Sequence, residues 1–194
     1  MCCRYYIHRD TESELGSLAQ TVDPSVKSCR AGDIRPSDLA LTLDRGPAGL
    51  RLGARKWGYP SPGGRKGLVI NARSESVSEK PLFRNGFHSG RIVVPASGFY
   101  EWAADRTKNL FWRRDSSPLY MAGICDRFDG EVRFAILTTA ANETMKPVHD
   151  RMPLILEQDE LSDWLSDDSA AEEILHQTPV LLSRQAEYEQ LSFF

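Results

Sequence analysis

The sequence is poor in cysteine, and it contains no long hydrophobic run. Only four of the 194 residues are cysteines, and none are spaced as Cys-x-x-Cys, so neither a disulfide framework nor a zinc ribbon is expected. The longest apolar runs, such as 119–125 and 134–137, fall far short of the roughly 20 residues that cross a bilayer. Charged residues interrupt the first turns, unlike a secretory signal. We therefore expect a reduced, cytoplasmic protein with no membrane span and no bound metal.

The modest net charge of −3 conceals a strong segregation along the chain. Residues 1–151 hold 23 of the 24 Lys and Arg against 17 of the 27 Asp and Glu, a balance of +6. Residues 152–194 hold Arg184 against ten acids, a balance of −9. Arginine supplies 18 of the basic residues, and its planar fork suits bidentate phosphate contacts. Two interpretations stay open: acidic helices that merely face water, or a basic groove that binds phosphate.

Hydrophobic patterning predicts a single α+β domain over residues 1–194, with strands in the middle and a mostly antiparallel sheet. No repeat, low-complexity tract or long linker divides the chain. Asp129-Gly130 is typical of a hairpin turn. The β-branched or apolar runs bounded by turn formers predict strands at 68–70, 91–95, 119–124, 132–138 and 153–156.

Helices are expected near both ends of the sequence. Apolar spacing predicts helices at 12–20 and 159–165, and Ser169 with Glu172 has the pattern of a capping box, so helices are expected to close the chain. The rest of the first third is expected to be irregular. Its turn formers indicate turns at 32–36 and 46–49 and a surface loop at 58–67, and Asn71 is expected at the end of a strand.

The second residue carries the most chemical information. A small side chain at position 2 usually permits removal of the initiator methionine, which leaves Cys2 with a free α-amine, a 1,2-aminothiol. With an amine pKa of about 8 and a thiol pKa of about 8.5, part of each group is nucleophilic at neutral pH. The amine forms an imine with an aldehyde, and the thiol then closes on the same carbon to give a five-membered thiazolidine. The alternative is that Cys2 is one more small residue at a frayed terminus.

Two other segments combine residues suited to binding or proton transfer. Asn71-Ala72-Arg73-Ser74-Glu75 offers an amide, a guanidinium and a carboxylate after a predicted strand, although the same residues suit a capped turn. The segment 97–102 sets Glu101 among three aromatic residues, where a desolvated carboxylate can exchange protons near neutral pH. A surface glutamate beside a half-buried aromatic run is the alternative.

His149 lies beside an apolar residue and close to an arginine, in Val-His-Asp-Arg-Met-Pro at 148–153. This setting suits acid–base catalysis or a phosphate contact, and a structural histidine is an equal alternative. His8, His88 and His176 are expected on the surface.

Four motifs in this order resemble one family. They are Met-Cys-x-Arg-Tyr at 1–5, Asn-Ala-Arg-Ser-Glu at 71–75, Gly-Phe-Tyr-Glu-Trp at 98–102 and His-Asp-Arg-Met-Pro at 149–153. Together they resemble the SOS response-associated peptidase (SRAP) family, whose members crosslink covalently to abasic sites in single-stranded DNA. The resemblance extends from Cys2 to about Leu156. It implies a barrel-like sheet with peripheral helices and a monomer without cofactor, nucleoid-associated if the source is bacterial.

The resemblance implies a role for each matching residue. Cys2 is the nucleophile that captures the ring-opened deoxyribose, and Asn71 orients its amine or the sugar. Glu101 moves protons during imine formation and sugar opening, and His149 assists proton transfer in ring opening or reversal. The implied DNA contacts are phosphate contacts from Arg4, Arg73 and Arg151, a base-stacking platform at Trp57, and a DNA path lined by Pro36 and Thr138.

Three departures from the family pattern affect these expectations. Cys3 stands where glycine is usual, and it can crowd the site or oxidise with its neighbour. The segment 58–64 is short and rich in Gly and Pro, so an aromatic wedge between DNA strands is expected to be reduced. A retained Met1 would cap the amine.

Two other function classes remain open from the sequence. One is a cysteine peptidase that uses Cys2, His149 and Asn71, or that removes only its own Met1. The other is a non-catalytic single-strand binder that relies on Arg73 and Trp57.

Overall fold

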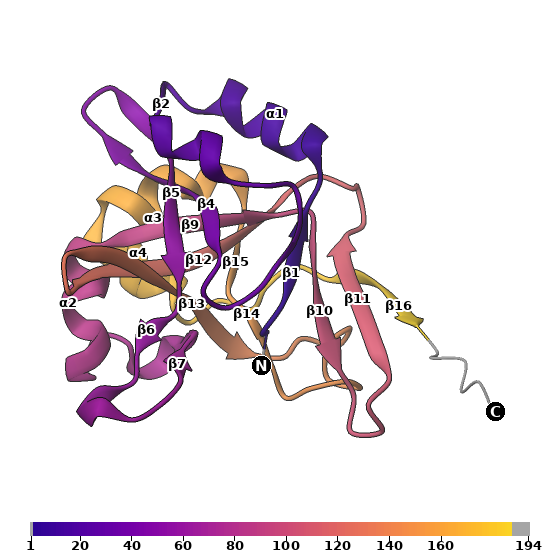
Figure 1. The fold of residues 1–194 in the computed structure, drawn as a ribbon. Coiled ribbons are helices and arrows are strands. Elements are labelled where there is room, and N and C mark those ends of the chain that lie inside the picture. The colour runs from indigo at the N-terminus through magenta and orange to yellow at the C-terminus, as the bar shows by residue number, and fades with distance from the viewer. Residues whose placement is uncertain (1, 188–194) are drawn as a thin grey trace.

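The fold is built around a closed five-stranded barrel, seen in a computed structural model that describes residues 2–187 (Figure 1). Neighbouring strands pair antiparallel around the barrel, and β13 closes it by pairing parallel with β5 at Arg133↔Lys56 and Phe134↔Trp57. The predicted strand-rich α+β class is confirmed, and the parallel closure is the detail that differs. The barrel strands are β4 (Leu39–Gly46), β5 (Gly49–Trp57), β9 (Arg91–Ala96), β12 (Leu119–Phe128) and β13 (Glu131–Ala140).

Shorter strands extend the barrel, and a second sheet lies beside it (Figure 1). The barrel extensions are β2 (Thr21–Val22) on β5, β8 (Asn71–Arg73) and β14 (Arg151–Pro153) on β13, and β15 (Ile155–Leu156) on β12. The second sheet has the order β16 (Leu182–Glu187), β11 (Lys108–Arg113), β10 (Gly98–Trp102), β1 (Tyr5–Ile7) and β3 (Gly32–Ile34), and a separate pair joins β6 (Tyr59–Pro60) to β7 (Leu68–Val69).

Aromatic residues join the barrel to the second sheet in one core. Trp57 is completely buried and stacks on Phe134 with ring centroids 6.2 Å apart. The Tyr5 ring, from the second sheet, lies 5.2 Å from the Trp57 ring. Trp57 Nε1 donates a hydrogen bond to the Ile70 carbonyl at 3.0 Å, so its single polar atom is satisfied inside the core. β1, which follows Cys2, is thereby held against the barrel.

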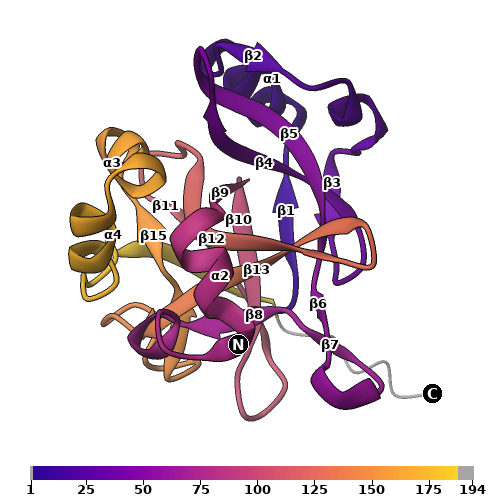
Figure 2. The same ribbon diagram turned by 90° about the vertical axis from the view of Figure 1, so that its left-hand side faces the viewer.

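Helices cover the flanks of the barrel (Figure 2). Trp164 in α3 donates from Nε1 to the Ile92 carbonyl at 2.9 Å, which fastens α3 to β9. In the described part of the chain, no helix is long and apolar enough to cross a membrane. The helices are α1 (Arg9–Leu18), α2 (Pro81–Ser89), α3 (Leu161–Ser166) and α4 (Asp168–Ile174), with 3-10 turns η1 (Pro24–Ser28), η2 (Pro62–Gly64), η3 (Ser74–Ser76) and η4 (Gln158–Glu160).

Most of the predicted elements are present with shifted ends. The runs at 91–95, 119–124 and 132–138 are the cores of β9, β12 and β13, and the 12–20 helix is α1. Asp129 and Gly130 have φ values of 49° and 84°, and they connect the Phe128↔Glu131 pair. Two positive φ values in a two-residue loop fit the twist of the strands. The hairpin prediction is therefore confirmed.

The prediction of an irregular first third is wrong, because β4 and β5 form the longest hairpin there. Leu39, Leu41 and Leu43 alternate with other residues along β4, a period-2 pattern typical of a strand. Glycines and arginines along β5 obscure the same pattern. Within the predicted surface loop, Tyr59 is buried in β6, whereas residues 62–67 are exposed.

The chain does not close with helices, because β16 follows α4 and pairs with β11. The predicted capping box at Ser169 is also wrong: Asp167 caps α4 by accepting from the Ser169 and Ala170 amides, and the capping box forms at Glu157 and Glu160 instead. The 153–156 strand is split at Leu154, whose amide and carbonyl bond to Leu137 and Ala122. Asn71 begins β8 rather than ending the strand before it.

Candidate active site at the N-terminal cysteine

Cys2 is held in place by contacts on two sides. It lies three residues before β1, which pairs with β10 and β3. Its side chain is buried, and Asn71 Nδ2 donates a hydrogen bond to the Cys2 carbonyl at 2.8 Å. Figure 2 shows the N-terminal end beside β8, the strand that Asn71 begins. Cys2 is therefore part of the folded structure, which excludes a frayed terminus at this residue.

The surroundings of Cys2 keep its thiol protonated. Burial, and then the nearby Glu101 carboxylate, raise the pKa of the Cys2 thiol far above its ordinary value. The same two causes raise the pKa of the Cys3 thiol, although Cys3 is exposed. The burial of Cys2 disfavours the ionised thiol that the sequence led us to expect at neutral pH. A base has to take the thiol proton when this sulfur acts as a nucleophile.

Glu101 is a buried carboxylate next to both cysteines. It lies on β10, and its register partner is the fully buried Asn109 on β11. Only 3% of Glu101 is exposed, whereas Tyr100 and Trp102 point to the other face of the strand and are half-buried. The surface alternative for Glu101 is excluded, and the predicted desolvated setting is confirmed.

Asn71 has one end of its amide free for a ligand. The strand β8 runs parallel to β13, and its Ala72 carbonyl accepts a hydrogen bond from Thr138 Oγ1 at 3.4 Å. Asn71 Nδ2 is used on Cys2, but its buried Oδ1 has no hydrogen-bond partner among the residues that the structure describes. A buried acceptor of this kind is costly unless something donates to it. An amine or hydroxyl at Cys2 can make that bond.

His149 has a partner for each of its protonation states. Its Nδ1 lies 2.9 Å from the Arg151 amide nitrogen and 2.8 Å from Asp150 Oδ1. A neutral ring accepts from the amide at Nδ1, and a protonated ring donates to the carboxylate. His149 lies two residues before β14, which pairs with β13 beside β8. Arg151 and Asp150 therefore both lie at the Nδ1 side of the ring.

The three predicted phosphate-binding arginines differ in availability. Arg73 is exposed at the end of β8. Arg4 forms an ion pair with Asp33 and lies 5.4 Å from the Tyr100 ring centroid. Arg151 is mostly buried, where it pairs through both terminal nitrogens with Glu75 and contacts the Thr138 carbonyl. Arg151 lowers the pKa of the Glu75 carboxyl, so this ion pair persists in mild acid.

Two predicted DNA contacts are buried in the fold. The prediction of an exposed stacking platform at Trp57 is wrong, because Trp57 has no exposed surface and packs between Tyr5 and Phe134. Thr138 is also fully buried, and its hydrogen bond to the Ala72 carbonyl joins β13 to β8. Thr138 therefore supports the strand on which Asn71 lies. Pro36 is half-buried before Ser37, whose φ of 80° marks a tight turn.

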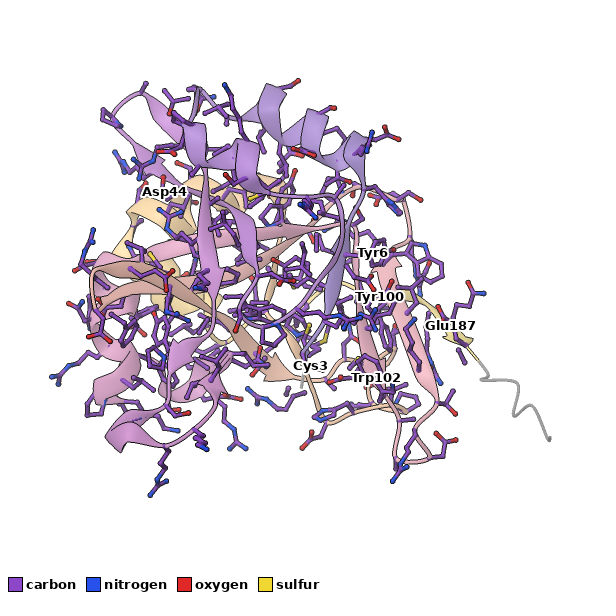
Figure 3. The ribbon with its side chains drawn as sticks, in the orientation of Figure 1. Cys3, Tyr6, Asp44, Tyr100, Trp102 and Glu187 are labelled. Carbon is purple, nitrogen blue, oxygen red and sulfur yellow. The ribbon has the colours of Figure 1, made fainter. Side chains whose placement is uncertain are left out.

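An aromatic face was missed in the sequence. Tyr6, Tyr100 and Trp102 lie along one side of β1 and β10 (Figure 3). The Tyr6 and Tyr100 ring centroids are 5.5 Å apart, and Lys108 Nζ lies 4.2 Å from the Tyr100 centroid. Period-2 alternation in Gly-Phe-Tyr-Glu-Trp was the available signal: Tyr100 and Trp102 share the face opposite Glu101.

No metal centre is evident among the described residues, where no three His, Cys, Asp or Glu side chains are grouped to hold an ion. The structure places the Asn71 amide and the Glu101 carboxylate at Cys2. His149, Arg73 and Arg151 lie on or beside β8 and β14, two strands that pair with β13.

The fold is that of a strand-rich barrel protein whose candidate site lies at its second residue. The chain belongs to the SOS response associated peptidase (SRAP) family, whose model matches residues 1–193. The resemblance that the four motifs indicated is thereby confirmed.

Named relatives agree with this membership, and a solved structure shares the fold. The chain is 35% identical over 147 residues to the abasic site processing protein YoaM of Bacillus subtilis, and the match covers 69% of this chain and 65% of YoaM. It is 27% identical to the abasic site processing protein YedK of Escherichia coli, with 89% of this chain and 83% of YedK covered. A crystal structure from Bordetella bronchiseptica shares the fold with a TM-score of 0.79 at 24% identity, covering 97% of this chain and 100% of that one.

Proposed function

We propose that this protein processes abasic sites in single-stranded DNA by forming a covalent thiazolidine through Cys2 once Met1 has been removed. Met1 lies outside the described residues, and its removal belongs to the proposal. The observation that carries the proposal is the fixed position of Cys2, which Asn71 holds at its carbonyl while the Glu101 carboxylate lies close to its thiol. The names of the YoaM and YedK relatives support the choice of substrate.

The proposed reaction needs no cofactor and balances with water as its only by-product. Proton transfer opens the abasic sugar to its aldehyde. The Cys2 amine adds to the aldehyde carbon, and loss of water gives an imine. The thiol then gives up its proton and its sulfur bonds to the same carbon, while the imine nitrogen gains a proton. Because the thiol is protonated at rest, we assign the first attack to the amine and the proton transfers to Glu101, with His149 assisting in sugar opening and reversal.

Single-stranded DNA is proposed to run across the exposed side of this site. Arg73 and Arg4 are placed to meet phosphates, and Pro36 lines the path. Arg151 pairs with Glu75, so we propose that Arg151 orders the loop after β8. It reaches a phosphate only when that phosphate replaces Glu75 as its partner. Bases are proposed to stack on Tyr100 and Trp102 in place of Trp57, because these rings are half-buried. The protein is proposed to act as a cytoplasmic monomer.

The two rival functions fit the geometry less well. A cysteine peptidase needs a thiolate, and the buried Cys2 thiol next to a carboxylate is poorly suited to ionise. A non-catalytic binder gives no reason for burying Glu101 beside two cysteines. Autocatalytic removal of Met1 is compatible with the proposed chemistry, because it precedes the reaction with DNA.

The test is covalent adduct formation with single-stranded DNA that carries one abasic site. Protein shown by mass spectrometry to lack Met1 should form a heat-stable adduct without any reducing agent, and Cys2→Ala should lose it. Cys3→Gly is the matched control, since it removes the neighbouring thiol and should retain the adduct. Undiminished heat-stable adduct in Cys2→Ala, or its loss in Cys3→Gly, contradicts the assignment of Cys2.

A further inference from the structure

A second polar cavity lies away from the cysteine site, at the end of the barrel near the β4–β5 hairpin. Figure 3 shows Asp44, which lines this cavity, well separated from Cys3. The cavity has a volume of about 340 Å³ and lies between β4, β5, the end of α2 and α3. We call it the arginine pocket, after its charged lining of Arg45, Arg51, Arg55, Arg91, His88 and Asp44.

Asp44 organises two of the arginines. Its carboxylate accepts from Arg51 Nε at 2.8 Å and Nη2 at 2.6 Å, and it also pairs with Arg55, whose other terminal nitrogen donates to Thr42. Gly53 lies between these two arginines on β5, and a Cβ there would lie 3.8 Å from Arg55 Nη1. That distance is an ordinary van der Waals contact, so the Arg55 side chain is placed by Asp44 and Thr42 rather than by the glycine. The guanidinium groups are therefore fixed before any ligand arrives.

The pocket carries more positive charge than its acids neutralise. One carboxylate serves both Arg51 and Arg55, and Arg51 Nη1 has no partner among the residues that the structure describes. Arg91 is satisfied separately by the Trp164 and Phe87 carbonyls and by Asp168. Arg45 is exposed at the rim. Four arginines against Asp44 and Asp168 leave a surplus of two positive charges, before any contribution from His88.

We propose that the arginine pocket binds the phosphate group of a small phosphorylated molecule, up to about the size of a mononucleotide. Planar guanidinium groups bind phosphate oxygens in pairs, and a surplus of fixed positive charge in a partly closed cavity favours an anion. The volume falls at the small end of ordinary ligand pockets, roughly 300–1,000 Å³. Leu165 supplies a small apolar surface for the rest of the molecule.

The test is calorimetric titration with inorganic phosphate, a deoxyribonucleoside monophosphate and the matching deoxyribonucleoside at constant ionic strength. Phosphate and the monophosphate should bind saturably, and the nucleoside should not. Arg51→Gln and Arg45→Gln should each weaken binding by about tenfold or more, the scale of one charge-assisted hydrogen bond. Arg30→Gln is the matched control, because Arg30 is exposed and outside the pocket, and it should bind like the parent.

Three results would overturn the proposal: no saturable binding of phosphate or monophosphate, equal binding by the parent and both pocket variants, or binding of a DNA oligonucleotide alone. The last result would assign the pocket to a DNA path. Arg45→Gln keeps the test valid if Arg51→Gln fails to fold, because the Arg45 side chain is exposed. Adduct formation at Cys2 should be unchanged in Arg45→Gln, so this proposal and the proposed function can fail separately.

Discussion

The buried carboxylate of Glu101 is the residue on which proton transfer at Cys2 is proposed to depend. Glu101→Gln keeps the shape and hydrogen-bonding capacity of the side chain but cannot accept a proton. Noncovalent DNA affinity should survive, while adduct formation should slow by about 10² or more, the usual scale of general acid–base catalysis. Rates measured against pH, with the exposed Glu79→Gln as control, test this. Equal rates for the parent and Glu101→Gln across the neutral range would make Glu101 a structural residue.

Asp44 gives a pH-dependent contribution to folding stability. Burial opposes its ionisation, but hydrogen bonds from Arg51 and Arg55 prevail and lower the pKa of its carboxyl below the ordinary value. A lowered folded-state pKa stabilises the protein above the unfolded value of about 3.9, and this contribution is lost as the pH falls through the folded-state pKa. The stability advantage over Asp44→Asn in urea unfolding should therefore shrink as the pH falls below about 5 and through the folded-state pKa. A constant difference would contradict the assignment.

At the scale of secondary structure elements, Gly98 sets the spacing between β1 and β10. A Cβ at Gly98 would lie 2.5 Å from the Phe111 carbonyl oxygen and 2.6 Å from the Tyr6 ring. Gly98→Ala should therefore push β1 away from β10, and it should destabilise the protein by about 1–3 kcal/mol, the usual range for overpacking.

Since β1 follows Cys2, adduct formation by Gly98→Ala should fall as well. Chemical unfolding and adduct yield measure the two effects. Gly130→Ala in the exposed hairpin is a control away from this contact, since a Cβ there meets no atom within 4 Å. Gly130→Ala therefore tests only the strain that a positive φ places on alanine. If Gly98→Ala is as stable as the wild type, the spacing role of Gly98 is contradicted.

Strand prediction succeeded where side chains alone define the pattern, as in β9, β12 and β13. It failed for β4 and β5, where Gly46 and Gly49 form the turn and charged side chains such as Arg51 and Arg55 occupy strand positions. Those arginines fit on the strand because Asp44 and Thr42, on the neighbouring strand, accept hydrogen bonds from them. Such a contact exists only in the folded protein, so the local sequence pattern does not indicate it. In the same way, the burial of Trp57 depends on β1 and β13 meeting over it. The motifs that contain Cys2 and Glu101 could be recognised because they are local in sequence, and the chemistry assigned to them stays a prediction.

Across the whole molecule, charge is separated between the site and the last helices. The acidic helices α3 and α4 lie on one flank of the barrel, away from the N-terminal end in both ribbon views (Figures 1 and 2).

DNA binding should weaken with salt. Arg73→Ala should reduce the magnitude of the log–log salt slope on single-stranded DNA by about 0.7, the share of one phosphate contact. Arg73→Lys keeps the charge and should keep the slope; an unchanged slope and affinity in Arg73→Ala would remove Arg73 from the phosphate path.

The hydrogen bond from Asn71 to Cys2 joins residues 69 positions apart. During synthesis it can therefore form only after the ribosome has passed residue 71. The ribosome makes roughly 5–20 residues per second, so about 5 to 20 s pass between residue 2 and the completion of β10 near residue 102. During that interval the partners that bury Cys2 do not yet exist. The nascent chain therefore carries Cys2 in the open, whereas the folded protein holds it between Asn71 and the strand β1. Under the proposed function, the share of molecules with a free aminothiol should depend on how fast Met1 is removed relative to the folding of β10 onto β1.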